Sequence, residues 1–248
     1  MNKKSADKKA FLIVHGMLQD FLSSSSNPPH EIYFELHPSV KDLFEAQGIP
    51  HTAVAKVEIN GMEQDFSYNI QEGDQIMLYP YDELAADYVD QIYQSPSSFI
   101  ADVHLGKLVK TLRLLGLDCA FDPHWDDQEI IDRSNAGPRM ILTRDLQLLK
   151  NGAANYGYWI RSTNPDEQIQ ELFARFDLAE KVNPFTCCMK CNGSLQQAEL
   201  QEVKDSVPPK VQQWHSDYWQ CTNCGQVYWQ GSHFKDLQQK VDKLLKDH

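Results

Sequence analysis

Four of the six cysteines are spaced as two metal-binding pairs near the C-terminus. Cys188 and Cys191 form one CxxC pair, and Cys221 and Cys224 form a second pair after 29 intervening residues. A glycine follows each pair within two residues and lets the chain turn so that backbone N–H groups approach the thiolates. Four thiolates favour tetrahedral Zn²⁺, with an iron–sulfur centre as the main alternative. A closed zinc site of this kind should stabilise a small ribbon rather than perform catalysis.

Carboxylates follow two apolar stretches in the middle of the chain. Phe99 and Ile100 lie just before Asp102, and the apolar run 140–142 lies just before Asp145. Each short apolar run predicts a buried strand. Carboxylates that are brought together repel one another unless a cation lies between them, and oxygen-rich clusters suit Mg²⁺ or Mn²⁺. Such an ion could activate water at a phosphodiester, so we expect both aspartates in one metal site.

A third carboxylate ligand is expected at the start of the next predicted helix. Asp127 is the leading candidate, Asp126 competes with it, and Asp122 is a further possibility. The alternative is that these acids only cap helices: Asp126 or Asp127 could be an N-cap, and Asp145 could cap the helix that begins after it.

Basic side chains accompany these acids. The apolar residues of the stretch 105–112 recur at helical spacing, and Lys107, Lys110 and Arg113 fall on the other flank of that helix. We expect these three cations to hold backbone phosphates. Lys107 and Arg144 would in addition orient the reacting phosphate or stabilise developing charge. The alternatives are a solvated helix face and, for Arg144, an ordinary surface ion pair.

Strands that alternate with helices must position these central residues. The stretches "FIAD", "DCAFD", "RMILTRD" and "YGYWIRS" are strand candidates, and helical patterns separate them. This alternation predicts a parallel sheet. Loops converge at the carboxyl ends of parallel strands, where we expect the aspartates to meet.

The first part of the chain has a different pattern. "EIYFEL" alternates as a strand, and "SVKDLFEAQG" is a short helix that Ser39 can cap and Gly48 can end. "AVAKVEI", the turn pair Asn60 and Gly61, and "DQIMLYPY" follow. Two strands, a helix and two more strands predict an α+β roll.

Charge and length limit the function classes. The 248 residues suffice for two or three domains of roughly 100–150 residues each. The net charge of −12 includes −9 within residues 1–95, which disfavours broad phosphate binding. The stretch "MNKKSADKKA" lacks the apolar segment of a secretory signal, and no run of about 18 apolar residues exists. We therefore expect a cytoplasmic protein without membrane contact, whose cysteines bind metal rather than form disulfides.

The first part resembles the ubiquitin-like β-grasp family, and especially its sulfur-carrier branch. The resemblance rests on "VKDLFEAQGIPHTAV" followed by "VEINGMEQDFSYNIQEGDQIMLYP". Sulfur carriers end in Gly-Gly, whereas this segment continues through Tyr79, Pro80 and Tyr81. The resemblance therefore implies an adaptor or stabilising domain, and its acidic surface could recruit a protein partner.

Nearly the whole chain resembles the Mut-seven C-terminal RNase family, which often carries this ubiquitin-like domain in front. The resemblance rests on "FIADVHLGKLVKTLRLLGLDCAF", "RMILTRDLQLL" and the C-terminal cysteines. It implies a PIN-like fold and a metal-dependent ribonuclease. By resemblance Asp102 and Asp145 match the motif acids, Asp127 matches the acid at the helix start, and Asp166 is a guess for a fourth.

The fold class that follows is a multi-domain α/β protein. We place the ubiquitin-like β-grasp domain at residues 1–95 and the PIN-like domain at 96–183. A Cys₄ zinc ribbon with a C-terminal helix completes the chain at 184–248.

Residues around the cysteine pairs suggest RNA contact. Trp219, Tyr228 and Trp229 could stack on bases, or they could only shield the ribbon. His233, in Trp-x-Gly-Ser-His, also matches the related family and could contact RNA or assist proton transfer, unless it is structural. Cys187 stands where the related family usually has Arg; this departure could weaken a phosphate contact, and it leaves a spare thiol that could compete for the metal.

The sequence is compatible with three functions. The first is a metal-dependent ribonuclease that hydrolyses RNA phosphodiesters. The second is a non-catalytic RNA, tRNA or ribosome-associated binding factor that uses the ribbon and the basic helix. The third is a regulatory, toxin-like PIN relative that needs a protein partner.

Overall fold

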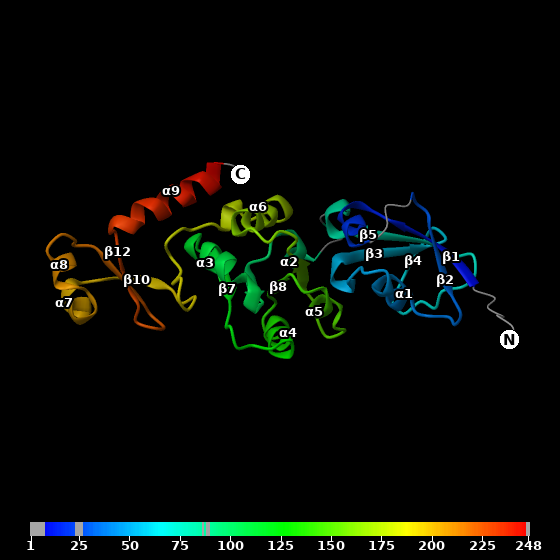
Figure 1. The fold of residues 1–248 in the computed structure, drawn as a ribbon, viewed down its shortest axis with the longest axis horizontal. Coiled ribbons are helices and arrows are strands. Elements are labelled where there is room, and N and C mark those ends of the chain that lie inside the picture. The colour runs from blue at the N-terminus through cyan, green and yellow to red at the C-terminus, as the bar shows by residue number, and fades with distance from the viewer. Residues whose placement is uncertain (1–7, 23–26, 86, 88–89, 247–248) are drawn as a thin grey trace. The chain divides into compact units, whose positions relative to one another are not determined.

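The computed structural model describes residues 8–22, 27–85, 87 and 90–246, and the first seven residues of the basic leader lie outside these ranges (Figure 1). The chain divides into two compact units. Unit 1 contains Met1–Gln94 and Asp145–Trp159, and unit 2 contains Ser95–Arg144 and Ile160–His248. The three-domain division made from the sequence stays a prediction.

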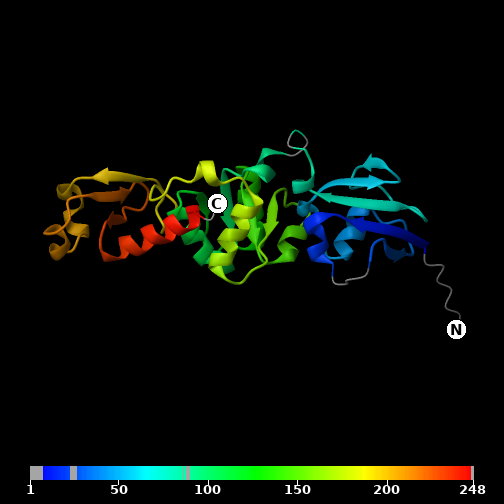
Figure 2. The same cartoon turned by 90° about the horizontal axis from the view of Figure 1, so that it is seen from above.

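Unit 1 is built around a five-stranded sheet with the order β2-β1-β5-β3-β4. The central strands β1 and β5 are parallel, and the other neighbours are antiparallel. Figure 2 shows the teal β5 between the dark blue β1 and the cyan β3. Helix α1 packs against this mixed sheet, which is the predicted β-grasp arrangement. The elements are β1 (Lys8–Val14), η1 (Gly16–Phe21), β2 (His30–Phe34), α1 (Val40–Ala46), η2 (His51–Ala53), β3 (Val54–Ile59), β4 (Met62–Gln64), β5 (Gln75–Pro80), η3 (Tyr81–Glu83) and α2 (Gln91–Gln94).

Local sequence signals set the helix and turn of this unit as predicted. The Ser39 side chain accepts a hydrogen bond from the Asp42 backbone N–H at 3.1 Å and caps α1. Gly48, which follows the helix, has φ +106°, a conformation that favours glycine. Asn60 and Gly61 both have positive φ values, of 54° and 78°, and connect β3 to β4 in a tight hairpin.

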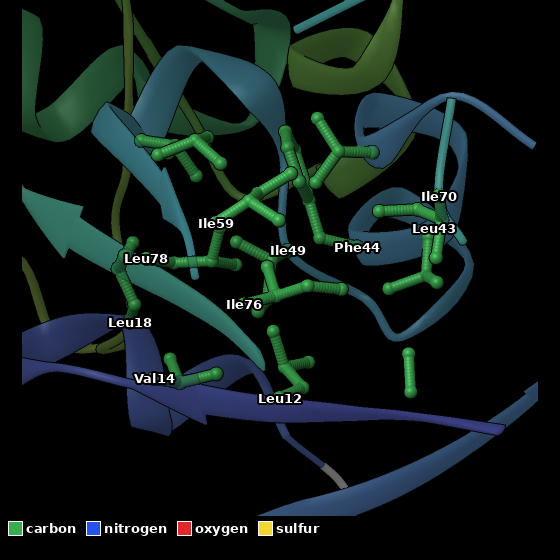
Figure 3. Close-up of a cluster of buried hydrophobic side chains, with 14 of the residues drawn as sticks. Leu12, Val14, Leu18, Leu43, Phe44, Ile49, Ile59, Ile70, Ile76 and Leu78 are labelled. Carbon is green, nitrogen blue, oxygen red and sulfur yellow. The ribbon is translucent and has the colours of Figure 1, made fainter. Parts of the chain in front are cut away.

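The core of unit 1 lies between the sheet and α1 (Figure 3). Burial alternates along β5, so that one face of the sheet meets the helix. The buried residues of this core are Ala10, Leu12, Val14, Leu18, Phe21, Phe34, Val40, Leu43, Phe44, Ile49, Val54, Val57, Ile59, Ile70, Ile76 and Leu78.

Two short elements from the middle of the chain also belong to unit 1. These are α5 (Leu146–Lys150) and β9 (Gly157–Trp159). Leu146 and Trp159 pack against the β-grasp core, and the Trp159 ring lies 5.0 Å from that of Phe21. A five-residue helix is not stable by itself, so these contacts must hold α5 in place.

Hydrogen bonds fix the end of α5 to the β-grasp. The Lys150 Nζ donates to the Glu45 carbonyl oxygen in α1 at 2.8 Å. The His51 ring lies between two acceptors, with Nδ1 2.7 Å from Glu45 Oε1 and Nε2 3.0 Å from the Ala154 carbonyl oxygen. This half-buried network lies within unit 1 and joins α1 to the chain that follows α5.

Unit 2 begins with parallel strands, as predicted. β6 lies between β7 and β8 and is parallel to both. α4 packs on β6 and β8, whereas α3 packs on β7 and α6 (Figure 1). This burial on both faces explains the continuous apolar runs in β6 and β8. The elements are β6 (Ser98–Ala101), η4 (Val103–Leu105), α3 (Gly106–Leu114), β7 (Asp118–Ala120), α4 (Asp127–Ala136), β8 (Met140–Thr143), α6 (Pro165–Arg175) and η5 (Ala179–Lys181).

The C-terminal part of unit 2 is a small antiparallel sheet with the order β10-β11-β12. It has a small core of its own, formed by Val203, Val207, Tyr218 and Val227. The elements are β10 (Leu195–Ala198), α7 (Leu200–Val203), η6 (Lys204–Ser206), α8 (Pro209–Gln212), β11 (Tyr218–Cys221), β12 (Val227–Trp229) and α9 (Ser232–Lys246). Among the helices in the described ranges, none is long and apolar enough to cross a membrane.

Gly116 provides a test of this packing. It follows α3 with φ +78°, and a Cβ there would lie only 1.9 Å from the Asn183 carbonyl oxygen. Gly116→Ala should therefore lower the thermal unfolding midpoint, because the left-handed conformation alone costs an alanine about 1–2 kcal/mol. Gly137→Ala is the matched control, since a Cβ at Gly137 meets nothing within 4 Å. Equal midpoints for the two variants would contradict this account.

Candidate functional site

Asp102 lies where β6 ends, and its buried carboxylate is held by three donors. It caps η4 by accepting a hydrogen bond from the His104 backbone N–H at 2.7 Å. Its second oxygen accepts from the Thr143 hydroxyl and from the Arg144 backbone N–H, the latter at 3.3 Å. Burying a carboxylate is costly unless donors compensate for the lost water. These donors fix its orientation at the carboxyl ends of β6 and β8.

Asp145 follows Arg144 in the chain and caps α5. Its Oδ1 accepts a hydrogen bond from the Gln147 backbone N–H at 2.7 Å. The capping alternative is therefore confirmed for this residue. A carboxylate has two oxygens and about four lone-pair sites, so a cap can also be a metal ligand. The metal role of Asp145 stays a prediction.

The acids before α4 divide between two roles. Asp126 is the N-cap in a reciprocal capping box with Glu129, with N···O distances of 2.9 and 3.3 Å. Asp127 is the first residue of α4 and is exposed. Asp122 accepts a hydrogen bond from the His124 backbone N–H at 2.9 Å. The helix-cap alternative is thus confirmed for Asp126, and Asp127 remains the candidate ligand.

The remaining predicted acid and three of the cations lie at the surface of their units. Asp166, the guess for a fourth acid, is an exposed residue that pairs with Lys240 Nζ at 3.2 Å. Lys107 and Lys110 are exposed on α3, and Arg144 is exposed after β8. These exposed cations remain candidates for phosphate contact.

Arg113 has a different environment from the other predicted phosphate ligands. It is buried, and its Nε donates to the Cys119 carbonyl oxygen at 2.9 Å. Its Nη1 donates to the carbonyl oxygens of Met189 and Lys190 at 3.3 and 3.1 Å. The guanidinium thus links β7 to the first CxxC turn, which favours a structural role for Arg113.

The four predicted cysteines come together in unit 2. The Sγ atoms of Cys188, Cys191, Cys221 and Cys224 all lie within 4.8 Å of one another. In a tetrahedral site with Zn–S bonds of about 2.3 Å, the sulfur atoms are about 3.8 Å apart. The closest pairs here are 3.4 and 3.7 Å apart, which is near that separation. These thiols could therefore hold a metal ion such as zinc. In the described part of the chain they are the one group of three or more His, Cys, Asp or Glu ligand atoms gathered in this way.

The crowding of the thiols also favours a cation. Burial raises the pKa of the Cys191 thiol, but hydrogen bonds from the Gly193 backbone and the neighbouring thiols outweigh it and lower that pKa to about 6. The Gln226 backbone lowers the pKa of Cys224, but burial and the neighbouring sulfurs raise it to about 12. The thiols would thus lose their protons in separate steps. A divalent cation would stabilise all four as thiolates.

Residues that carried no predicted role complete this region. Asn192 has a positive φ of 69° and lies within the first CxxC turn. Its Oδ1 accepts a hydrogen bond from the Cys119 backbone N–H at 3.0 Å, and its Nδ2 donates to Asp118. Asn adopts the left-handed conformation more readily than most residues, so an Asn directly after a CxxC pair could have indicated a turn with positive φ. Thr143 offered a similar signal, as a lone hydroxyl at the end of an apolar strand.

Four residues with a predicted RNA contact, Trp219, Tyr228, Trp229 and His233, line one groove. Trp229 on β12 and His233 in the first turn of α9 both border a cavity of about 1040 Å³. Cys187, the spare thiol, also lines it. Burial raises the pKa of the Cys187 thiol, which disfavours the thiolate that a metal ligand needs.

Metal analysis tests the cysteine tetrad. The purified chain should contain about one zinc ion per molecule, and Cys221→Ser should lose it, because a closed site needs four ligands. Cys187→Ser is the matched control and should retain the metal and the thermal unfolding midpoint. Loss of zinc from both variants, or from neither, would contradict the assigned ligands.

Comparison with known families agrees with this organisation. A family model described as the Mut7-C RNAse domain matches residues 97–241, and a model described as Mut7-C ubiquitin matches residues 7–85. No curated protein and no solved structure gave a significant match. The first model covers more than half of the chain, and the order of the two matches is the predicted one. The chain therefore belongs to the Mut7-C RNase family.

Proposed function

We propose that this protein is a metal-dependent ribonuclease that hydrolyses RNA phosphodiesters. The observation that carries the proposal is the buried Asp102 carboxylate, which three donors orient at the ends of two parallel strands. Ligand-binding residues of parallel sheets gather at these ends. The match to the RNase domain model includes this residue and supports RNA as the substrate.

Asp102, Asp127 and Asp145 are the proposed ligands for Mg²⁺ or Mn²⁺. Their hard carboxylate oxygens suit these ions. The ion would supply Lewis acidity and neutralise charge at the phosphodiester. Asp102 has the most restricted position of the three, so its proposed role is to fix the geometry of the site.

Cations near these acids are proposed to hold the RNA backbone. Lys107 lies at the start of α3, five residues after Asp102, and Arg144 lies just before Asp145. We assign both to orienting the phosphate or stabilising developing charge. Lys110, one helical turn further along, would contact a neighbouring phosphate.

The cysteine tetrad is proposed to hold structural Zn²⁺ rather than an iron–sulfur cluster. The short separations between the sulfur atoms match one tetrahedral ion. A bound Zn²⁺ would stabilise a ribbon whose own core, in the described part of the chain, contains four buried hydrophobic residues.

Paired Asp→Asn variants test the catalytic proposal. Wild type and the Asp102→Asn, Asp145→Asn double variant are incubated with labelled RNA, with and without Mn²⁺. The double variant should cut at least about 100-fold more slowly, since a catalytic metal supplies several kcal/mol and each 1.4 kcal/mol changes a rate tenfold.

Two further aspartates serve as controls. Asp132 is an exposed acid on α4 that accepts a hydrogen bond from Gln128, and Asp132→Asn should cut at the wild-type rate. Asp126→Asn should also stay active, because asparagine caps helices as well as aspartate does. Equal rates for wild type and the double variant would defeat the catalytic assignment.

A non-catalytic factor is the second candidate function. Asp102, Asp126 and Asp145 each cap a helix, which gives these acids a structural reason to be present. In this case the protein would hold RNA, tRNA or a ribosomal surface through the ribbon, with Trp229 and His233 as contacts. Crosslinking in cells would then recover stable, uncut RNA.

Charge and cysteine chemistry support proposals for a partner and a location. The first 95 residues carry a charge of −9 and could recruit a basic protein partner, as a regulated nuclease would need. Co-purification of such a protein in equal amount would support this role. We propose a cytoplasmic location, because all six cysteines are free and four of them are grouped for a metal.

A further inference from the structure

The groove beside the cysteine tetrad is formed entirely within unit 2. It has a volume of about 1040 Å³ and extends along the hairpin of β11 and β12 to the first turns of α9. Segments 184–189 and 208–215 complete its walls. Cavities of this size hold small molecules or parts of larger ligands.

Six aromatic rings line this groove. Trp219 and Tyr228 are directly paired across β11 and β12, so their side chains lie on the same face of the hairpin. Trp214 is 76% exposed. The full set is Phe185, Trp214, Trp219, Tyr228, Trp229 and Phe234.

Contacts with neighbouring residues hold several of the aromatic rings in place. The Tyr228 hydroxyl lies 3.1 Å from the Cys188 Sγ, which fixes the ring to the tetrad. The Phe185 and Phe234 rings are 4.8 Å apart and pack together. Part of the Trp229 ring packs against the small core of the ribbon, which leaves Trp214, Trp219 and Tyr228 as the better stacking surfaces.

Charge decides what class of ligand fits these rings. The groove is lined by Lys210, His215 and His233 among others, and no Asp or Glu is found among the described residues that line it. This is unusual for a chain with a net charge of −12. Aromatic rings stack on flat rings, and Lys210 supplies a positive charge that no carboxylate of the lining opposes, so a ligand that combines flat rings with negative charge is favoured.

We infer that this groove binds the unpaired bases of single-stranded RNA by stacking. The inference rests on the proposed function for its choice of RNA and adds the strand class that is recognised. Trp214, Trp219 and Tyr228 would stack on bases, and Lys210 would approach the backbone. Double-stranded RNA would be excluded, because its bases are already stacked inside the helix.

Fluorescence anisotropy with a labelled single-stranded oligonucleotide tests the inference. Measurements without added Mg²⁺ or Mn²⁺ in an Asp102→Asn background prevent cleavage. Trp219→Ala should weaken binding about tenfold, since one stacked base contributes about 1–3 kcal/mol. Trp219→Phe retains a ring and should bind within about threefold of the parent. A duplex of the same sequence should bind weakly to every variant.

Two further variants guard against misfolding and non-specific effects. Trp214→Ala changes an exposed ring, so it should fold normally and still weaken binding about fivefold or more. Trp125 stacks on Arg133 outside the groove, and Trp125→Ala should bind as the parent does. Zinc content and the thermal unfolding midpoint identify any variant that has lost its fold.

The outcomes separate this inference from the proposed function. If the single strand binds Trp214→Ala and Trp219→Ala as tightly as the parent while Asp102→Asn abolishes cutting, the groove inference is overturned and the nuclease proposal stands. If both variants lose binding but no form of the chain cuts RNA, the groove inference stands alone. Self-association that Trp214→Ala abolishes, without RNA binding, would overturn it in favour of a second copy in the groove.

Discussion

The hydrogen bonds of the Asp102 carboxylate join the two strand ends on which the proposed site depends. The carboxylate lies at the end of β6. The Thr143 hydroxyl and the Arg144 N–H lie at the end of β8 and donate hydrogen bonds to it. Because the group is buried, removing any donor would leave part of a charge without a partner, which costs about 1–3 kcal/mol or more. The register of these two strands and the position of the carboxylate therefore depend on each other.

The cysteine tetrad is joined to the parallel sheet by an equally direct connection. Arg113 reaches from α3 to the carbonyl oxygens of the first CxxC turn, and Asn192 reaches back from that turn to Cys119 on β7. A metal ion held by the tetrad would therefore stabilise more than the small ribbon. The geometry of the tetrad affects β7, the edge strand beside the strand that leads to Asp102. The Tyr228 hydroxyl extends the same connection to the aromatic groove.

Much of the fold could be predicted because its signals are local. The Ser39 cap, the Asn60–Gly61 turn and the apolar strands before Asp102 and Asp145 each depend on a few adjacent residues. The CxxC spacing likewise brought the right four cysteines together.

Other features depended on packing that the sequence does not encode locally. Helical spacing placed Arg113 on the flank away from the apolar residues of its helix, but it did not show that the first CxxC turn packs there. Arg113 was therefore predicted as a phosphate ligand, although it is buried and structural. The groove combines Phe185, Trp214 and Phe234 from distant segments without a shared period. For Asp145 the local pattern allowed both a cap and a metal ligand, and packing alone cannot choose between roles that one carboxylate can fill together.

The docking of α5 on the β-grasp affects how these segments can be inherited. The helix that starts after Asp145 lies within the RNase match, yet Lys150 and Leu146 find their partners in the ubiquitin-like match. A gene fusion that exchanged the leading segment for an unrelated one would leave an apolar helix face and an ammonium group without their native neighbours. Natural recombination should therefore tend to move the two segments together, as a single heritable block.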